Sequence, residues 1–456
     1  MFRSGTLTRL TLSTALLLTT ISLSTASEAP YGITKRPAGK AYLGLPDRAD
    51  GHLPLRLSET GAFGDIGKIT PAEALIPYDI NVSFWSDGAH KTRWMSVPND
   101  NDSSAADRKI GFSPTGEWKF PKGTVFVKHF ELPVDDTHPN VRRRLETRFI
   151  VCDSTGSVYG VTYKWRPDNS DADLLATNVT ELIPIKTASG MRTQSWYYPS
   201  RQDCRICHTD LAGGVLGVKT RQMNCDFSFP SGFKDNQLRA WNHAGLFKPE
   251  LKESEIARLP RLAAMADAAK PIEERARSYL DANCAHCHRP NGTVAMFDAR
   301  YNTPLERQNL IEGPVLIDQG VDKARAIAPN DPWRSIVLMR LNSVEGMKMP
   351  PLAHQVLDQE GCGLIKEWIL SMPGPPVLAP PEIAPPGGRV NTSSKIMLRH
   401  ADPGAVIHYT LDGSAPNNSD PVYKEPLELT GPSVVRARAY KPGFTRSIVS
   451  QEVFSE

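Results

Sequence analysis

The sequence lacks a marked net charge and, beyond its first 23 residues, a long hydrophobic run. It holds 53 basic residues against 50 acidic ones, and the basic count falls to 51 without the N-terminal Arg3 and Arg9. A charge so close to zero argues against nucleic acid as a partner. The absence of a second apolar run predicts no transmembrane segment in the mature chain.

The first 26 residues are typical of a cleavable signal peptide. Arg3 and Arg9 precede the apolar run LTLSTALLLTTISL, and the small residues Ser24 and Ala26 follow it. The run is too short and too rich in threonine and serine for a membrane span. No cysteine follows it directly, which argues against a lipid anchor, so we expect a soluble periplasmic or secreted protein.

Cysteine is scarce, with 7 in 456 residues, and three of the seven lie outside any motif: Cys152, Cys225 and Cys362. An odd number in an oxidising compartment allows at most one internal disulfide among them. A Cys152–Cys225 bond is the favoured pairing, because Cys362 lies in a predicted helix. The alternative is that all three are small apolar fillers.

The other four cysteines form two C-x-x-C-H motifs, the signature of covalently attached c-type haem. Two thiols on one helical turn can each add to a porphyrin vinyl group, and the histidine behind them becomes an axial ligand of the iron. The copies are Cys204 and Cys207 with His208, and Cys284 and Cys287 with His288. The sequence therefore predicts two covalently bound c-type haems.

Two other interpretations of the cysteine pairs fit the sequence less well. A four-thiolate zinc site would need a much shorter gap than that between Cys207 and Cys284, and it would leave both histidines unexplained. A thioredoxin-like pair would need a strand before it, whereas PIEERARSYLDAN before Cys284 predicts an amphipathic helix.

The sixth ligand of each iron would decide between an electron carrier and a catalyst. For the second haem we expect Met349, in a loop stiffened by Pro350 and Pro351, with Met347 as the register-shifted alternative. For the first haem five candidates stay open: Met191, Met223, His90, His129 and His243. An open position there would permit peroxidase-like chemistry. His286, inside the second motif, is expected to point away from the iron and to be exposed.

The patterning predicts a multidomain α+β protein. After the signal peptide (1–26) we expect a β-rich, sandwich-like domain, an all-α c-type cytochrome region with two haems, and an Ig-like β-sandwich. The boundaries are 27–195 for the β-rich domain, 196–265 for the first haem-binding segment, 266–372 for the cytochrome c domain with the second haem, 373–386 for a proline-rich linker and 387–456 for the Ig-like domain.

Two stretches resemble known families. Residues from about 75 to 372, including IPYDINVSFWSDGAHKTRW, FPKGTVFVKHFEL, CRICH, YLDANCAHCHRPNG and MKMPP, resemble a family of uncharacterised bacterial di-haem c-type cytochromes. This resemblance implies two haems and ligation by Met349. Residues from about 380 to 456, through GAVIHYTLDGSAP and VVRARAYKPGFTRS, resemble the Ig-like C-terminal domain of chitobiases and β-hexosaminidases. That domain is an accessory, and without the catalytic barrel it implies no glycosidase activity.

These patterns predict a periplasmic or secreted di-haem cytochrome that carries single electrons between a donor and an acceptor redox protein. Two alternatives stay open. One is a peroxidase-like or oxidase-like enzyme with an open site at the first haem, which leaves it uncertain whether the protein is an enzyme. The other is an adaptor that docks on a carbohydrate or cell surface through its C-terminal domain and carries a haem relay.

Overall fold

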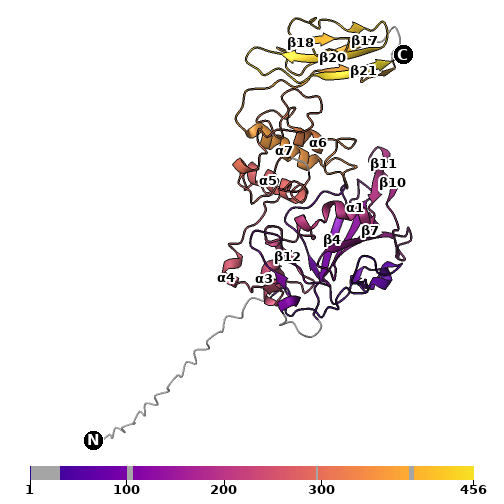
Figure 1. Cartoon of the computed structure of the whole chain (residues 1–456), viewed down its shortest axis with the longest axis vertical. Coiled ribbons are helices and arrows are strands. Elements are labelled where there is room, and N and C mark those ends of the chain that lie inside the picture. Colours follow the sequence, from indigo (N-terminus) through magenta and orange to yellow (C-terminus); the bar gives the residue numbers. More distant parts are fainter. Residues whose placement is uncertain (2–30, 100–105, 294–295, 390–394, 456) are drawn as a thin grey trace.

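The computed structural model describes residues 1, 31–99, 106–293, 296–389 and 395–455. Three regions follow one another along its long axis, with the N-terminal sheet at one end and the C-terminal sandwich at the other (Figure 1). Apart from Met1, the predicted signal peptide lies outside the described residues. Among the described residues, no helix has both the length and the apolar character needed to cross a bilayer.

A six-stranded antiparallel sheet forms the centre of the N-terminal region. Its strands, in spatial order, are β3 (Ile76–Tyr78), β4 (His90–Ser96), β6 (Val125–Pro133), β7 (Arg142–Cys152), β8 (Val158–Trp165) and β9 (Ala172–Leu174). Strands β7 and β8 form a hairpin around the turn segment DSTGS, and they pair up to Cys152 opposite Val158. Side chains alternate between two faces, so Val125 and Val127 of β6 enter one core and Phe126 enters another.

Other elements surround this sheet. They are η1 (Leu57–Thr60), β1 (Phe63–Asp65), β2 (Thr70–Pro71), η2 (Ala106–Arg108), β5 (Ile110–Gly111), β10 (Val179–Thr187) and β11 (Gly190–Tyr198). Strands β10 and β11 form a separate hairpin that leads directly into the first cysteine motif.

The prediction of an all-α central region is wrong. In the described structure more residues lie in strands than in helices. The region contains α1 (Arg201–Cys207), η3 (Asp210–Ala212), α2 (Thr220–Met223), β12 (Asp226–Ser228), β13 (Lys234–Asn236), α3 (Gln237–His243), β14 (Phe247–Lys248), α4 (Glu253–Ile256), α5 (Ile272–Asn283), η4 (Leu305–Arg307), α6 (Ile336–Leu341) and α7 (Gln359–Ser371). Only α5 and α7 exceed seven residues.

Local chemistry explains this correction. The helical periodicity between residues 253 and 283 is interrupted by Pro260 and Pro271, which cannot donate the hydrogen bonds of a helix interior, so α4 stops at Ile256 and α5 starts only at Ile272. In addition, β14 pairs in parallel with β5 of the N-terminal region.

The two halves of the central region belong to different cores. The segment after the first motif packs on the sheet, where Trp241 and Phe247 share a core with Phe126 and Cys152. The segment with the second motif forms its own core between α5 and α7, built around residues such as Tyr279 and Trp368. The cysteine motifs therefore approach each other from two separately packed units.

The C-terminal region is a two-sheet sandwich. One sheet contains β15 (Glu382–Ala384), β17 (Lys395–Arg399) and β19 (Leu427–Glu428), and the other contains β16 (Gly388–Arg389), β21 (Ser450–Ser455), β20 (Ser433–Tyr440) and β18 (Val406–Thr410). Asp322 of the central region binds three arginines, with nitrogen–oxygen distances of 3.3 Å to Arg334, 3.1 Å to Arg438 and 3.2 Å to Arg446. Because two of these arginines belong to the sandwich, the sandwich is fixed to the central region.

Candidate metal centre

The first motif lies on the short helix α1, at the end of the hairpin β10–β11. Ser200 caps the helix, because its side chain accepts the Asp203 backbone N–H while the Asp203 carboxylate accepts the Ser200 N–H at 2.8 Å. The helix ends at His208, whose N–H donates to the Cys204 carbonyl oxygen at 2.9 Å. Capping at both ends fixes the direction of the two thiols, although the helix is only seven residues long.

The second motif follows the end of α5. Cys284 is the C-cap residue of that helix. The N–H groups of Cys287 and His288 both donate to the Cys284 carbonyl oxygen, at 3.1 and 2.8 Å. The helix end is tied to the N-terminal region by Asn283, whose side-chain oxygen accepts the Trp85 N–H at 2.8 Å.

Two buried cations hold the second motif against the segment that follows the first. The Arg289 guanidinium donates to the Leu211 carbonyl oxygen at 2.8 Å and to the Glu117 carboxylate at 2.9 Å. The Lys219 ammonium lies 2.6 Å from the Asp281 carboxylate, which is almost fully buried. These ion pairs join segments that are about 60 to 170 positions apart in the chain.

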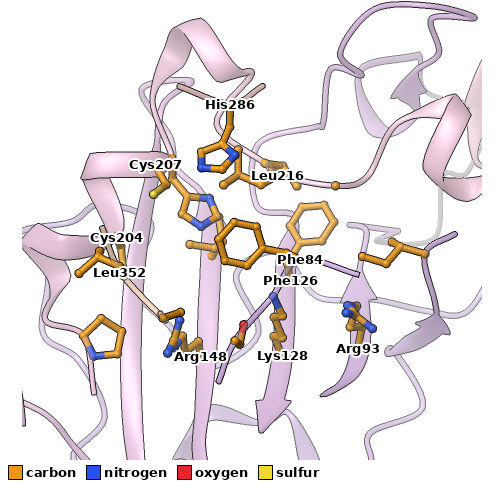
Figure 2. Close-up of a pocket in the computed structure, with 18 of the residues that line it drawn as sticks. Phe84, Arg93, Phe126, Lys128, Arg148, Cys204, Cys207, Leu216, His286 and Leu352 are labelled. Carbon is orange, nitrogen blue, oxygen red and sulfur yellow. The ribbon is translucent and has the colours of Figure 1, made fainter. Parts of the chain in front are cut away.

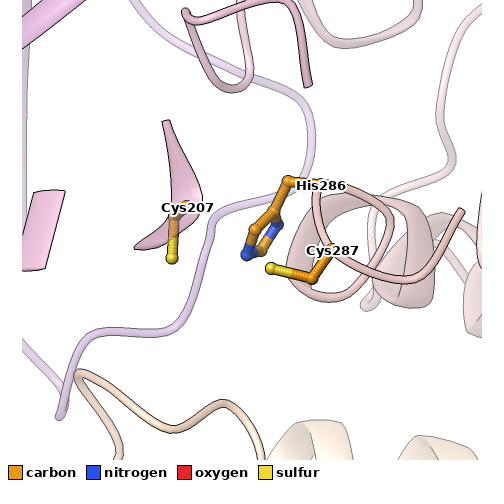
Figure 3. A group of neighbouring side chains, drawn as sticks. All are labelled: Cys207, His286 and Cys287. Atoms are coloured by element: carbon orange, nitrogen blue, oxygen red, sulfur yellow. The ribbon is translucent and has the colours of Figure 1, made fainter. Parts of the chain in front are cut away.

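The consequence is a convergence of the two motifs on one point. The ligand atoms of Cys207, His286 and Cys287 all lie within 4.8 Å of one another (Figure 3). The Cys207 thiol donates a hydrogen bond to Cys287, and this bond raises the pKa of Cys207 and lowers that of Cys287. Two sulfurs bound to one ion at 2.3 Å in tetrahedral geometry lie about 3.8 Å apart, so the group needs little movement to bind a metal.

The prediction of two covalently bound haems is wrong. Two haems require two separate sets of thiols and axial ligands, but within the described ranges the one group of three possible metal ligands combines one cysteine from each motif. The histidine in this group is His286, which we expected to point away from the iron and to be exposed. It is instead half-buried, with its ring centroid 5.6 Å from that of Phe84.

The remaining residues of the first motif line a cavity of about 170 Å³, which we call the cationic cavity. Cys204, Cys207 and His286 face Arg93, Lys128 and Arg148 of the sheet across it (Figure 2). His208 also lines this cavity. His208 Nδ1 donates to the Gly214 carbonyl oxygen at 2.8 Å, and burial lowers the pKa of His208 to about 4, so its ring is neutral. None of the five candidates for a sixth ligand at the first motif (Met191, Met223, His90, His129 and His243) is among the described residues that line this cavity.

Residues of the second motif line another cavity of about 150 Å³, which we call the apolar cavity. Cys284 and His288 share it with Met349, whereas Met347 is not among its described lining residues. The His288 ring stacks on Phe297, with centroids 4.4 Å apart and planes inclined by 13°. Burial raises the pKa of Cys284 to about 12, so this thiol stays protonated.

The cysteines outside the motifs are structural. Cys152, Cys225 and Cys362 are all buried and all free, so the favoured Cys152–Cys225 disulfide is absent from the structure. Burial raises the pKa of each thiol, to about 12, 11 and 11, and a protonated buried thiol behaves as a small apolar side chain.

Comparison with known proteins matches one domain family to part of the chain. Residues 385–451 match the chitobiase/beta-hexosaminidase C-terminal domain. The C-terminal sandwich is a domain of this type. No curated protein and no solved structure matches the chain. The resemblance of residues 75–372 to di-haem cytochromes receives no support from these comparisons.

Sequence reasoning missed His286 and the three cations of the cationic cavity. The only local signal for His286 was its position next to Cys287, because its third partner lies 79 positions away from it at Cys207. Arg93, Lys128 and Arg148 occur in the alternating stretches HKTRW, VFVKHF and LETRF, where each cation replaces an apolar residue on one face. That alternation could have indicated a cationic face of the sheet.

Proposed function

We propose that this chain is an electron-transfer protein of the periplasm or cell exterior, with one transition-metal centre at Cys207, His286 and Cys287. The observation that supports this proposal is the convergence of these three ligand atoms within 4.8 Å from two separately packed units. Two thiolates and an imidazole form a soft donor set, which favours copper or zinc over magnesium or calcium. Copper is the redox-active metal of that pair, and it would supply a single-electron couple when bound.

The residues around the centre suit this role. The ion pairs of Arg289 with Glu117 and of Lys219 with Asp281 hold the two motifs in place, so the ligand atoms need not reorganise when the charge of the metal changes. The ligand group also borders the cationic cavity, which gives a small partner molecule access to it. Donor and acceptor redox proteins remain the expected macromolecular partners.

Metal analysis of the purified full chain tests this function. We expect about one copper ion per chain by plasma mass spectrometry and a reversible one-electron couple by potentiometric titration. The Cys207→Ser variant should lose both. Stoichiometric zinc with no redox couple would overturn electron transfer, and a pyridine haemochrome signal from covalently attached haem would overturn the identity of the centre.

The family match supports a second, subordinate proposal for the C-terminal sandwich. Residues 385–451 are similar to a domain that chitobiases and β-hexosaminidases carry, so this domain would dock the redox centre on a carbohydrate or cell surface. Co-sedimentation of the full chain with insoluble chitin tests it. Full recovery of the protein in the supernatant, at every chitin concentration, would contradict docking on this polysaccharide.

A further inference from the structure

Three basic side chains lie in a row across the sheet beneath the first motif. In the strand register, Arg93 of β4 is opposite Lys128 of β6, and Lys128 is opposite Arg148 of β7. Directly opposite residues of antiparallel neighbours project from the same face of a sheet. The three cations therefore form one wall of the cationic cavity, as Figure 2 shows.

Only the two outer cations of this row have carboxylate partners. Arg93 donates to Asp79 at 2.6 Å, and Arg148 makes a two-pronged contact with Glu146 at 2.8 and 2.6 Å. For the Lys128 ammonium, in the part of the chain that the structure describes, no carboxylate oxygen lies within 4.0 Å.

Two aromatic rings lie near the Lys128 ammonium. Its ammonium lies 5.2 Å from the ring centroid of Phe130 and 6.0 Å from that of Phe84. Burial lowers the pKa of Lys128, and the positive charges of Arg93, Lys91 and Arg148 lower it further. A partly buried ammonium in this setting is stabilised by an anion that enters the cavity.

The other walls of the cationic cavity are mainly apolar. Ser86, Gln222 and Asp203 also line it, and the Asp203 carboxylate accepts hydrogen bonds from Ser200 and Tyr197. Phe84 and Phe126 face it with Ile150, Leu216 and Leu352. Its volume of about 170 Å³ is close to that of an engineered apolar cavity, roughly 150 Å³, that binds benzene. The cavity therefore suits a small flat hydrocarbon body, and its single unpartnered cation suits one negative group on that body.

We propose that the cationic cavity binds a small aromatic carboxylate, whose anionic group pairs with Lys128 and whose ring lies against Phe84 and Phe126. Cys207 and His286 line the same cavity, so the bound molecule lies beside the metal centre. This inference rests on the proposed function only where it places the bound molecule beside a metal centre. The binding itself depends on the sheet and its cations.

Calorimetric titration of the full chain with 2-naphthoate and with its neutral analogue 2-naphthylmethanol tests the proposal. A charge-assisted hydrogen bond in a buried site predicts a preference of at least about tenfold for the anion. Lys128→Met should reduce the preference to about one while the alcohol still binds, and Lys128→Arg should keep it. Lys68→Met, at a lysine with 82% side-chain exposure, is the matched control and should change nothing.

The outcomes separate clearly. Equal affinity of the wild-type chain for both compounds, no binding of either, or an intact preference in Lys128→Met would overturn the proposal. Leu216→Trp, which fills the cavity without removing the lysine, gives an independent check and should abolish binding of both compounds; unchanged affinities would also overturn it. Cys207→Ser should lose the metal yet still bind 2-naphthoate, so a failure of the metal centre and a failure of the anion site give different results.

Discussion

The two C-x-x-C-H motifs are alike in spacing but lie in different surroundings. The first is carried by a seven-residue helix on the face of a sheet, beside a cavity with three cations. The second ends a twelve-residue helix packed on α7, beside a cavity lined mainly by apolar residues. The local pattern sets the donor types, whereas the tertiary contacts decide which donors meet. Cys207 and Cys287 meet, while Cys204 and Cys284 line separate cavities.

The largest expected effect comes from removing one thiol of the shared group. Cys207→Ser should lower the metal affinity of the full chain by more than about 100-fold, since even changes outside the ligand set cost 10- to 100-fold. Cys284→Ser is the matched control, because its thiol belongs to the apolar cavity and should leave the metal content unchanged. Plasma mass spectrometry after dialysis against a weak chelator measures both variants.

A metal loss of the same size in both variants would contradict the different roles of Cys207 and Cys284. It would mean that each motif binds its own ion as a unit. Loss in Cys284→Ser alone would move the centre to the second motif and contradict the convergence at Cys207.

Motif spacing singled out Cys207 and Cys287 but not His286, and it did not indicate that these three residues come together. Cys204, Cys207, Cys284 and Cys287 were identified by spacing, a local property that short-range chemistry controls. The contact between Cys207 and Cys287 depends on Arg289 reaching Glu117 across 172 positions, and no periodicity in the sequence encodes that distance. The β7–β8 hairpin, by contrast, has a local signal, since alternating residues in RLETRFIVC and VYGVTYKW flank the turn segment DSTGS. The all-α prediction for the central region failed because the strands β12, β13 and β14 and stretches without helix separate its short helices.

The C-terminal sandwich was the most predictable part. Its turn signals and alternating strands are local, and residues 385–451 match a known domain family. Its fixed attachment was not predictable, because the proline-rich linker suggested a spacer. In the structure Leu378 of that linker donates its N–H to the Thr445 carbonyl oxygen at 3.0 Å, and Asp322 binds arginines that lie far along the chain.

A smaller effect is expected from separating the motifs without touching a ligand. Arg289→Met removes the contacts to Leu211 and Glu117 and leaves that carboxylate without its partner. Because Arg289 is buried and Glu117 is partly exposed, the free energy of unfolding should fall by about 2 to 3 kcal/mol. Urea unfolding measures the change, and metal affinity should fall with it.

An exposed pair gives the control for this substitution. Lys252→Met removes a contact between side chains that are 79% and 59% exposed, and it should change the free energy of unfolding by less than about 1 kcal/mol. If Arg289→Met is no more destabilising than Lys252→Met, the contacts of Arg289 do not hold the motifs together. The convergence of the thiols would then need another cause.

The smallest effect is expected at the contact between the central region and the C-terminal sandwich, where Asp322 binds the arginines of the sandwich. Burial raises the pKa of Asp322, but Arg334, Arg438 and Arg446 lower it more, so the folded carboxyl has a lowered pKa. A lowered folded pKa means that the stabilisation is fully present above the unfolded value of about 3.9 and is lost as the pH falls through the folded value. Hydrogen exchange in β20 should therefore rise below about pH 4 in the wild-type chain, and Asp322→Asn should show that increase already at pH 7, with a loss of about 1 to 2 kcal/mol. Exchange in α1 should not change, because the first motif packs on the N-terminal sheet and has no contact with this carboxylate; a parallel increase there would show that the two motif units unfold together.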